Sequence, residues 1–168
     1  MVRNALFLSA LALLPQVFAT PTGPTPGDYG YDHHIPIGRR TAQEVIAKLN
    51  LTSNVEKGYY IQTFEDPDVV PGTNRSLSTA IYYLLEGSAG PSYWHRVDNV
   101  EVWHYYAGAP LNLSLSHDDG APVKVVTLGP DVFKGQQPQY PIEKWEWQSA
   151  RSLGDWTLVG TTGKQRLR

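Results

Sequence analysis

Residues 92–108 read SYWHRVDNVEVWHYYAG, and this stretch indicates both the fold and the candidate site. Its second half, residues 100–106, is rich in aromatic and β-branched side chains and is followed by a Gly-Ala-Pro turn signal, which predicts a β-strand. Successive side chains of a strand point to opposite faces, so Glu101, Trp103 and Tyr105 share one face. The predicted strand therefore presents a carboxylate beside two aromatic rings.

The first half of the stretch, residues 92–97, has a similar strand-like composition and carries His95. A turn over residues 96–99 would join the two halves as a hairpin and bring His95 and Glu101 to one inner face. An imidazole beside a carboxylate is half of a metal site or an acid–base pair. The pattern leaves open a second interpretation, a surface ion pair beside an aromatic core.

The rest of the chain alternates short β-prone runs with turn signals. Such runs are expected at residues 59–64, 78–85, 111–115, 123–128, 146–149 and 156–161. A capping box, Thr41-Ala-Gln-Glu44, predicts one short helix that continues to about Leu49. Many short strands after a single helix indicate an all-β fold, an antiparallel sandwich or barrel.

The N-terminal residues 1–19 have the parts of a secretory signal peptide. Arg3 gives a positive start, residues 5–14 are apolar, and small residues precede a cleavage site after Ala19. The apolar run is too short to span a membrane, so the protein is expected to be secreted. Residues 20–40 are rich in Pro and Gly and are expected to form a flexible arm.

Composition narrows the class of protein further. The chain has 168 residues, a net charge of −2 and no basic run, so one domain is expected and nucleic acid is not an expected partner. It has no cysteine, so its core must hold the domain together without disulfides. The N-glycosylation sequons at Asn50, Asn74 and Asn112 fit the secretory route.

Several of these motifs together resemble a known family. Glu101, followed after six residues by Gly108, matches the end of the first cupin motif, and His95 stands at that motif's first histidine. Four segments are similar to the branch called cupin-5, a family of unassigned function: Ser78–Leu85, Trp94–Arg96, Glu101–His104 and Gln148–Leu153. The resemblance implies an antiparallel cupin barrel, also called a double-stranded β-helix or jelly roll, over residues 41–162.

The chain also departs from the cupin-5 pattern. Val97 replaces the second motif histidine, Asn54 replaces a histidine ahead of the first strand, and Gln148 falls where the second motif expects a histidine. After residue 162 the family continues with a further strand, whereas this chain ends in a short basic tail, residues 163–168. An edge of the barrel is therefore expected to stay unpaired.

The resemblance implies a set of site residues inside the barrel. His95 and Glu101 would be the catalytic pair, and with Gln148 they could hold a divalent metal, although the metal set is incomplete. His104 would need a β-bulge to turn inward and complete it. The ligand-binding residues are expected to be Glu56, Tyr60, Gln62, Trp103, Tyr105, Gln148 and Arg151.

Two functions follow from this resemblance. The first is a small-molecule-modifying enzyme of the isomerase, epimerase, cyclase or oxidoreductase type, in a natural-product pathway by analogy with other secreted cupins. The second is a non-catalytic protein that binds a sugar or another small ligand. Cupins commonly pair through their sheets, so a homodimer is expected.

Overall fold

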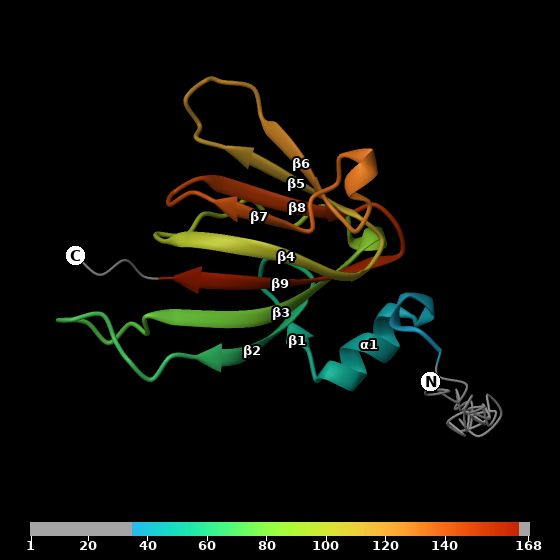
Figure 1. Cartoon of the computed structure of the whole chain (residues 1–168), viewed down its shortest axis with the longest axis horizontal. Coiled ribbons are helices and arrows are strands. Elements are labelled where there is room, and N and C mark those ends of the chain that lie inside the picture. The colour runs from blue at the N-terminus through green and yellow to red at the C-terminus, as the bar shows by residue number, and fades with distance from the viewer. Residues whose placement is uncertain (1–34, 165–168) are drawn as a thin grey trace, which may run out of the picture. The chain divides into compact units, whose positions relative to one another are not determined.

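The computed structural model describes residues 35–164, which form two antiparallel β-sheets with one α-helix beside the larger sheet (Figure 1). The larger sheet has the order β1 (Thr52–Ser53), β2 (Tyr59–Glu65), β3 (Ser78–Glu86), β9 (Trp156–Lys164), β4 (Val100–Gly108) and β7 (Gln139–Ile142). The smaller sheet has the order β6 (Lys124–Leu128), β5 (Leu111–Ser116) and β8 (Trp147–Ser152). The prediction of an all-β antiparallel fold with one short N-terminal helix is confirmed.

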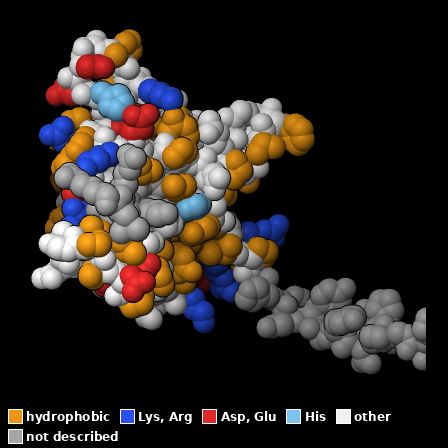
Figure 2. All heavy atoms as spheres, turned by 60° about the vertical axis from the view of Figure 1, so that its left-hand side comes forward, with side chains coloured by type: hydrophobic (Ala, Val, Ile, Leu, Met, Phe, Trp, Pro, Cys, Tyr) orange, Lys and Arg blue, Asp and Glu red, His pale blue; other side chains and the backbone are white. Residues whose placement is uncertain are grey.

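The main core lies between the two sheets. The leucines of β5 alternate with polar residues, as expected for a strand with one face toward a core. On the larger sheet, Tyr83, Trp103 and Val159 turn inward from neighbouring strands and are at most 3% exposed. Figure 2 shows hydrophobic side chains across the middle of one face of the molecule, with most charged side chains around its margin.

Helix α1 (Ala42–Leu49) covers part of the outer face of the larger sheet. The predicted capping box is present: the hydroxyl of Thr41 accepts the Glu44 N–H at 3.3 Å, and the Glu44 carboxylate accepts the Thr41 N–H at 2.8 Å. Val45 packs in a second apolar cluster with Leu84 and Leu158. The helix ends at Asn50, which adopts the left-handed conformation with φ 54°.

The predicted flexible arm is more ordered at its C-terminal end than the sequence indicated. Residues Ile37–Arg39 form a 3₁₀ turn, η1, and the carbonyl of Arg40 accepts the Trp156 indole N–H at 2.8 Å. The predicted signal peptide, residues 1–19, and the rest of the arm to residue 34 lie outside the described residues. At the other end, β9 continues into the basic tail as far as Lys164, which pairs with Ser78.

Two further expectations were wrong in detail. Residues 92–97 do not form a strand; within them, His95 makes an isolated bridge with Gln148. No strand was predicted between the runs at residues 123–128 and 146–149, yet this segment contains a 3₁₀ turn, η3 (Val132–Lys134), and the strand β7. A third 3₁₀ turn, η2 (Gly87–Ala89), follows β3.

The two sheets do not close into a continuous barrel within residues 35–164. Bridges at His95–Gln148 and Leu128–Gln137 are isolated pairs rather than strand ladders. The edge strands are β1 and β7 in the larger sheet and β6 and β8 in the smaller sheet, whereas β9, the last strand, is paired on both sides. In this part of the chain no helix is long and apolar enough to cross a membrane.

A charged contact ties the loop between β2 and β3 to the segment before β4. The two terminal nitrogens of the Arg75 guanidinium, Nη1 and Nη2, donate to the carboxylate of Asp98, and these hydrogen bonds hold the pKa of that carboxyl below its usual range. The pair therefore stabilises the fold at pH values above about 4, the pKa of an aspartate in the unfolded chain. This stabilisation is lost as the pH falls through the lower pKa that the carboxyl has in the folded protein.

Asp98→Asn should accordingly lower the free energy of unfolding by about 0.5–1 kcal/mol at pH 7, a small value because the pair is partly exposed. The loss should be smaller at about pH 3, below the unfolded-state pKa of about 4, than at pH 7. Urea denaturation at both pH values measures this. An equal loss at the two values would contradict the prediction.

Candidate functional site

The first part of the site is built around Glu101 on the inner face of β4. One of its carboxylate oxygens, Oε2, accepts the Trp103 indole N–H at 3.1 Å and the Gln148 side-chain N–H at 2.8 Å. Trp103 is 2% exposed and Gln148 is fully buried. The bond from Trp103 lies within β4, and the bond from Gln148 connects the larger sheet to β8 of the smaller sheet.

His95 joins this group through its backbone. The His95 N–H donates to the Gln148 carbonyl at 3.1 Å, and the Gln148 N–H donates to the His95 carbonyl at 2.8 Å. Two residues that exchange both hydrogen bonds are directly opposite in an antiparallel pair, so their side chains project from the same face. His95 and Gln148 therefore lie side by side, and Gln148 touches Glu101.

The carboxylate that contacts His95 is that of Glu56, not Glu101 as the sequence suggested. Glu56 Oε2 lies 3.3 Å from Nδ1 of His95, and the carbonyl of Tyr93 lies 3.1 Å from the same nitrogen. Glu56 is positioned by its own backbone: its N–H donates to the Asn54 side chain at 2.9 Å, and its carbonyl accepts the Tyr93 N–H at 3.2 Å. The expected hairpin is thus replaced by contacts between three separate segments.

These contacts decide the tautomer of His95. Both partners of Nδ1 are hydrogen-bond acceptors, so Nδ1 carries the proton and Nε2 keeps its lone pair in the neutral imidazole. The His95 side chain is 19% exposed and that of Glu56 is 36% exposed, so both are reachable from solvent. A neutral imidazole held in this way has the chemistry to accept a proton at Nε2.

The proposed metal set does not fit a tightly bound divalent ion. The oxygen of Glu101 nearest Gln148 already accepts two N–H groups, and the positive ends of those groups point at the place a cation would take. Residues 35–164 hold no cluster of three or more His, Cys, Asp or Glu side chains suited to a metal. His104 does not complete the set, since it lies on the outer face, where it stacks on Tyr106 with ring centroids 6.4 Å apart.

One atom of this group has no partner. Oε1 of Gln148 is buried and accepts no hydrogen bond from any group in the described part of the chain. A buried acceptor left without a donor carries a desolvation cost of about 1–3 kcal/mol. That cost would be offset by a donor brought by a ligand or by water.

The remaining predicted ligand residues divide into two groups. Tyr105 lies on the inner face, where its hydroxyl donates to the Gly108 carbonyl at 2.6 Å. Tyr60 and Gln62 share the inner face of β2 but stand near the sheet edge, where Tyr60 is 37% exposed and Gln62 bonds to Glu65.

Arg151 does not join the site. It is exposed and lies three residues from Gln148 on the same strand, so it projects from the opposite face of β8. Its prediction as a ligand-binding residue is corrected accordingly.

Sequence reasoning missed two buried supports of the site. The hydroxyl of Tyr83 donates to the Lys57 carbonyl at 2.8 Å, next to Glu56 in the chain, and burial raises the pKa of that hydroxyl well above its usual range. Ser92 is 3% exposed and accepts the Ala150 N–H through its hydroxyl at 2.9 Å, which anchors the segment that carries His95. Ser92 opens the stretch quoted above, but its role depends on a partner 58 residues away.

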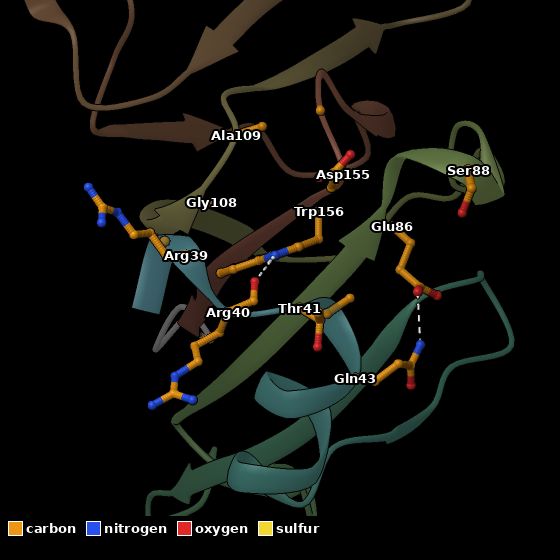
Figure 3. Close-up of a pocket in the computed structure, with 13 residues that line it drawn as sticks. Arg39, Arg40, Thr41, Gln43, Glu86, Ser88, Gly108, Ala109, Asp155 and Trp156 are labelled. Carbon is orange, nitrogen blue, oxygen red and sulfur yellow. Dashed lines mark hydrogen bonds between the residues drawn. The ribbon is translucent and has the colours of Figure 1, made fainter. Parts of the chain in front are cut away.

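A cavity of about 920 Å³ beside α1 is a separate feature of the molecule (Figure 3). Two hydrogen bonds join residues of its lining: Gln43 donates to Glu86 at 2.9 Å, and Trp156 donates to the Arg40 carbonyl at 2.8 Å. In Figure 3 the guanidinium groups of Arg39 and Arg40 point away from the Trp156 ring. None of the predicted site residues lines this cavity.

Comparisons with known proteins support the fold. A hypothetical protein from Leishmania major is 26% identical, with a TM-score of 0.68 over 74% of this chain and 81% of that chain. A protein from Shewanella oneidensis is also 26% identical, with a TM-score of 0.69 over 77% of this chain and 80% of that chain. No curated protein matches the sequence. The sequence profile of Cupin_5, described as Cupin superfamily (DUF985), matches residues 43–163, and the chain belongs to this family.

Proposed function

We propose that this cupin is a small-molecule-modifying enzyme in which His95 acts as a general base oriented by Glu56. The observation that carries the proposal is the pair of acceptors on Nδ1, which leaves Nε2 free to take a proton. The reaction type would be an isomerisation, epimerisation or cyclisation, or an oxidoreduction that begins with proton removal. A place in natural-product biosynthesis is part of the same proposal.

The surrounding residues have separate tasks in this proposal. When Nε2 takes a proton, the imidazole becomes positively charged, and the adjacent Glu56 carboxylate stabilises that charge. Oε1 of Gln148 would accept a hydrogen bond from a hydroxyl or amine of the substrate. Glu101 acts as a positioning residue, because its hydrogen bond to Nε2 of Gln148 directs Oε1.

Two measurements test the proposal that His95 acts as a general base. Long-range ¹⁵N NMR of the histidine rings should show the Nδ1–H tautomer for His95. The preference should be weaker in Glu56→Gln, where the Tyr93 carbonyl remains but the negative charge is lost. A screen of sugars and carbonyl compounds in D₂O should then find a substrate whose carbon-bound hydrogen exchanges. His95→Gln should slow that exchange by a factor of about 10²–10⁴.

The matched control is His104→Gln, which removes an imidazole from the outer face of the same domain. It should leave the exchange rate unchanged. An Nε2–H tautomer for His95 would count against the proposal, as would equal exchange rates in wild type and His95→Gln.

We also propose that the protein is secreted and N-glycosylated. Asn50 and Asn74 are exposed, whereas Asn112 is partly buried and accepts a hydrogen bond from Thr127 at 2.9 Å. Glycans should therefore be found at Asn50 and Asn74 more often than at Asn112. Intact-mass analysis of secreted protein before and after a glycosidase measures this, and full occupancy at Asn112 alone would contradict the expected order.

The expected homodimer stays a proposal, and the outer face of the larger sheet supports it. Phe64, Val100 and Tyr106 are each about half exposed there, at 49%, 48% and 50%. Tyr82 packs edge-on against Tyr106 at 5.8 Å, so the face carries an aromatic patch. Tyr106→Glu should shift a dimer toward monomer in light scattering, and a wild type that is monomeric at high concentration would refute the proposal.

A further inference from the structure

A second group of chemistry-bearing side chains lies on the outer side of the smaller sheet. The leucines of β5 face the core, so Ser116 faces outward, where it stands opposite Trp147 of β8. Here a groove of about 280 Å³ is lined by Trp94, Ser116, Asp118, Val123 and Trp147. Trp94 is 47% exposed, so its indole is open to a ligand from solvent.

The Trp147 ring, which forms one side of the groove, is held in its orientation by the guanidinium of Arg96. The guanidinium of Arg96 lies 4.8 Å from the centroid of the Trp147 ring and 5.6 Å from that of the Trp145 ring. Arginine stacks on aromatic faces in this way and restrains them. The Trp147 wall is therefore held in place before a ligand arrives, which lowers the entropy lost on binding.

The rim of the groove supplies hydrogen-bonding groups. The hydroxyl oxygen of Ser116 accepts the Asp118 N–H at 3.0 Å, so its own proton remains free to donate. Over residues 35–164, no hydrogen bond or salt bridge engages the Asp118 carboxylate, although its backbone is held in the turn. A donor and a strong acceptor thus stand beside two indole rings.

We propose that this groove binds the ring of a neutral carbohydrate, at a site separate from the His95 region. Indole faces attract the polarised C–H bonds of a pyranose, while the carboxylate and hydroxyl at the rim pair with sugar hydroxyls. Asp118 disfavours an anionic ligand, and Arg96 on the Trp147 ring disfavours a cationic one. The volume is close to the lower limit of about 300 Å³ for ligand sites, which suits one sugar ring.

Titration of the full-length purified protein with cellohexaose, chitohexaose and mannohexaose tests this proposal. Tryptophan fluorescence and calorimetry should show saturable binding of at least one of the three. Trp94→Ala and Trp147→Ala should each raise Kd about tenfold or more, and Asp118→Asn should raise it severalfold. Trp94→Tyr keeps an aromatic face and should retain most of the affinity.

The matched control is Trp145→Ala, which removes a ring that is 50% exposed and also contacts Arg96 but does not line the groove. It should change Kd less than about twofold. Circular dichroism and thermal unfolding verify that each variant is folded. The proposal is overturned if none of the three saccharides saturates, if Trp94→Ala binds as wild type does, or if His95→Gln abolishes binding.

Discussion

Trp103→Ala is expected to lower the free energy of unfolding by about 3–5 kcal/mol, a large part of the 5–15 kcal/mol typical of a domain. Trp103 is 2% exposed and lies at the centre of the inner face of β4. Its ring meets Tyr83 edge-on, with centroids 6.0 Å apart and planes at 82°. Alanine would leave a cavity between the sheets that neighbouring strands cannot fill without breaking their pairing.

Two comparison variants separate the causes of this loss. Trp103→Phe keeps most of the ring volume but removes the N–H that donates to Glu101, so it should cost about 1.5–3 kcal/mol. Trp145→Ala removes a half-exposed indole and should cost less than about 1 kcal/mol. Urea denaturation, analysed with one m-value for all variants, measures the loss in the free energy of unfolding for each of the three. Similar losses for Trp103→Ala and Trp145→Ala would show that the assignment of the core is wrong.

The inward face of β4 was predictable from the sequence because it depends on local alternation. Glu101 and Trp103 are two residues apart in a β-prone run, and the structure joins them by a hydrogen bond on that face. The same rule places Arg151 on the opposite face from Gln148, since three residues separate them. Alternation along β8 is therefore sufficient by itself to exclude Arg151 from the face that carries Gln148.

The partner of His95 was not predictable in this way. The contact with Glu56 joins segments 39 residues apart, and it depends on a turn in which Lys57 takes a positive φ of 77°. β7 was missed for a related reason: Pro141 is unfavourable in a central strand but is tolerated at a sheet edge. Local composition does not distinguish an edge strand from a loop, because the difference depends on whether another strand lies beside the segment in the folded protein.

Glu101→Leu should also lower the free energy of unfolding by about 3–5 kcal/mol, through a different mechanism. The carboxylate oxygen accepts N–H groups from Trp103 and Gln148, and both of these side chains are buried. Leucine would leave two buried donors without an acceptor, at a cost of about 1–3 kcal/mol each. Glu101→Gln keeps an oxygen at this position, so it should cost only about 1 kcal/mol.

A double-mutant cycle with Gln148→Leu identifies the mechanism. In Glu101→Leu/Gln148→Leu the buried amide is absent, so the double variant should be more stable than the sum of the single losses predicts, by about 1–2 kcal/mol. Additive losses would mean that the hydrogen bond contributes nothing. The turnover of Glu101→Gln can be measured on any substrate found in the D₂O screen. If Glu101 is a positioning residue, this variant retains turnover. A loss of about 10²–10⁴ in rate would instead make Glu101 part of the acid–base chemistry.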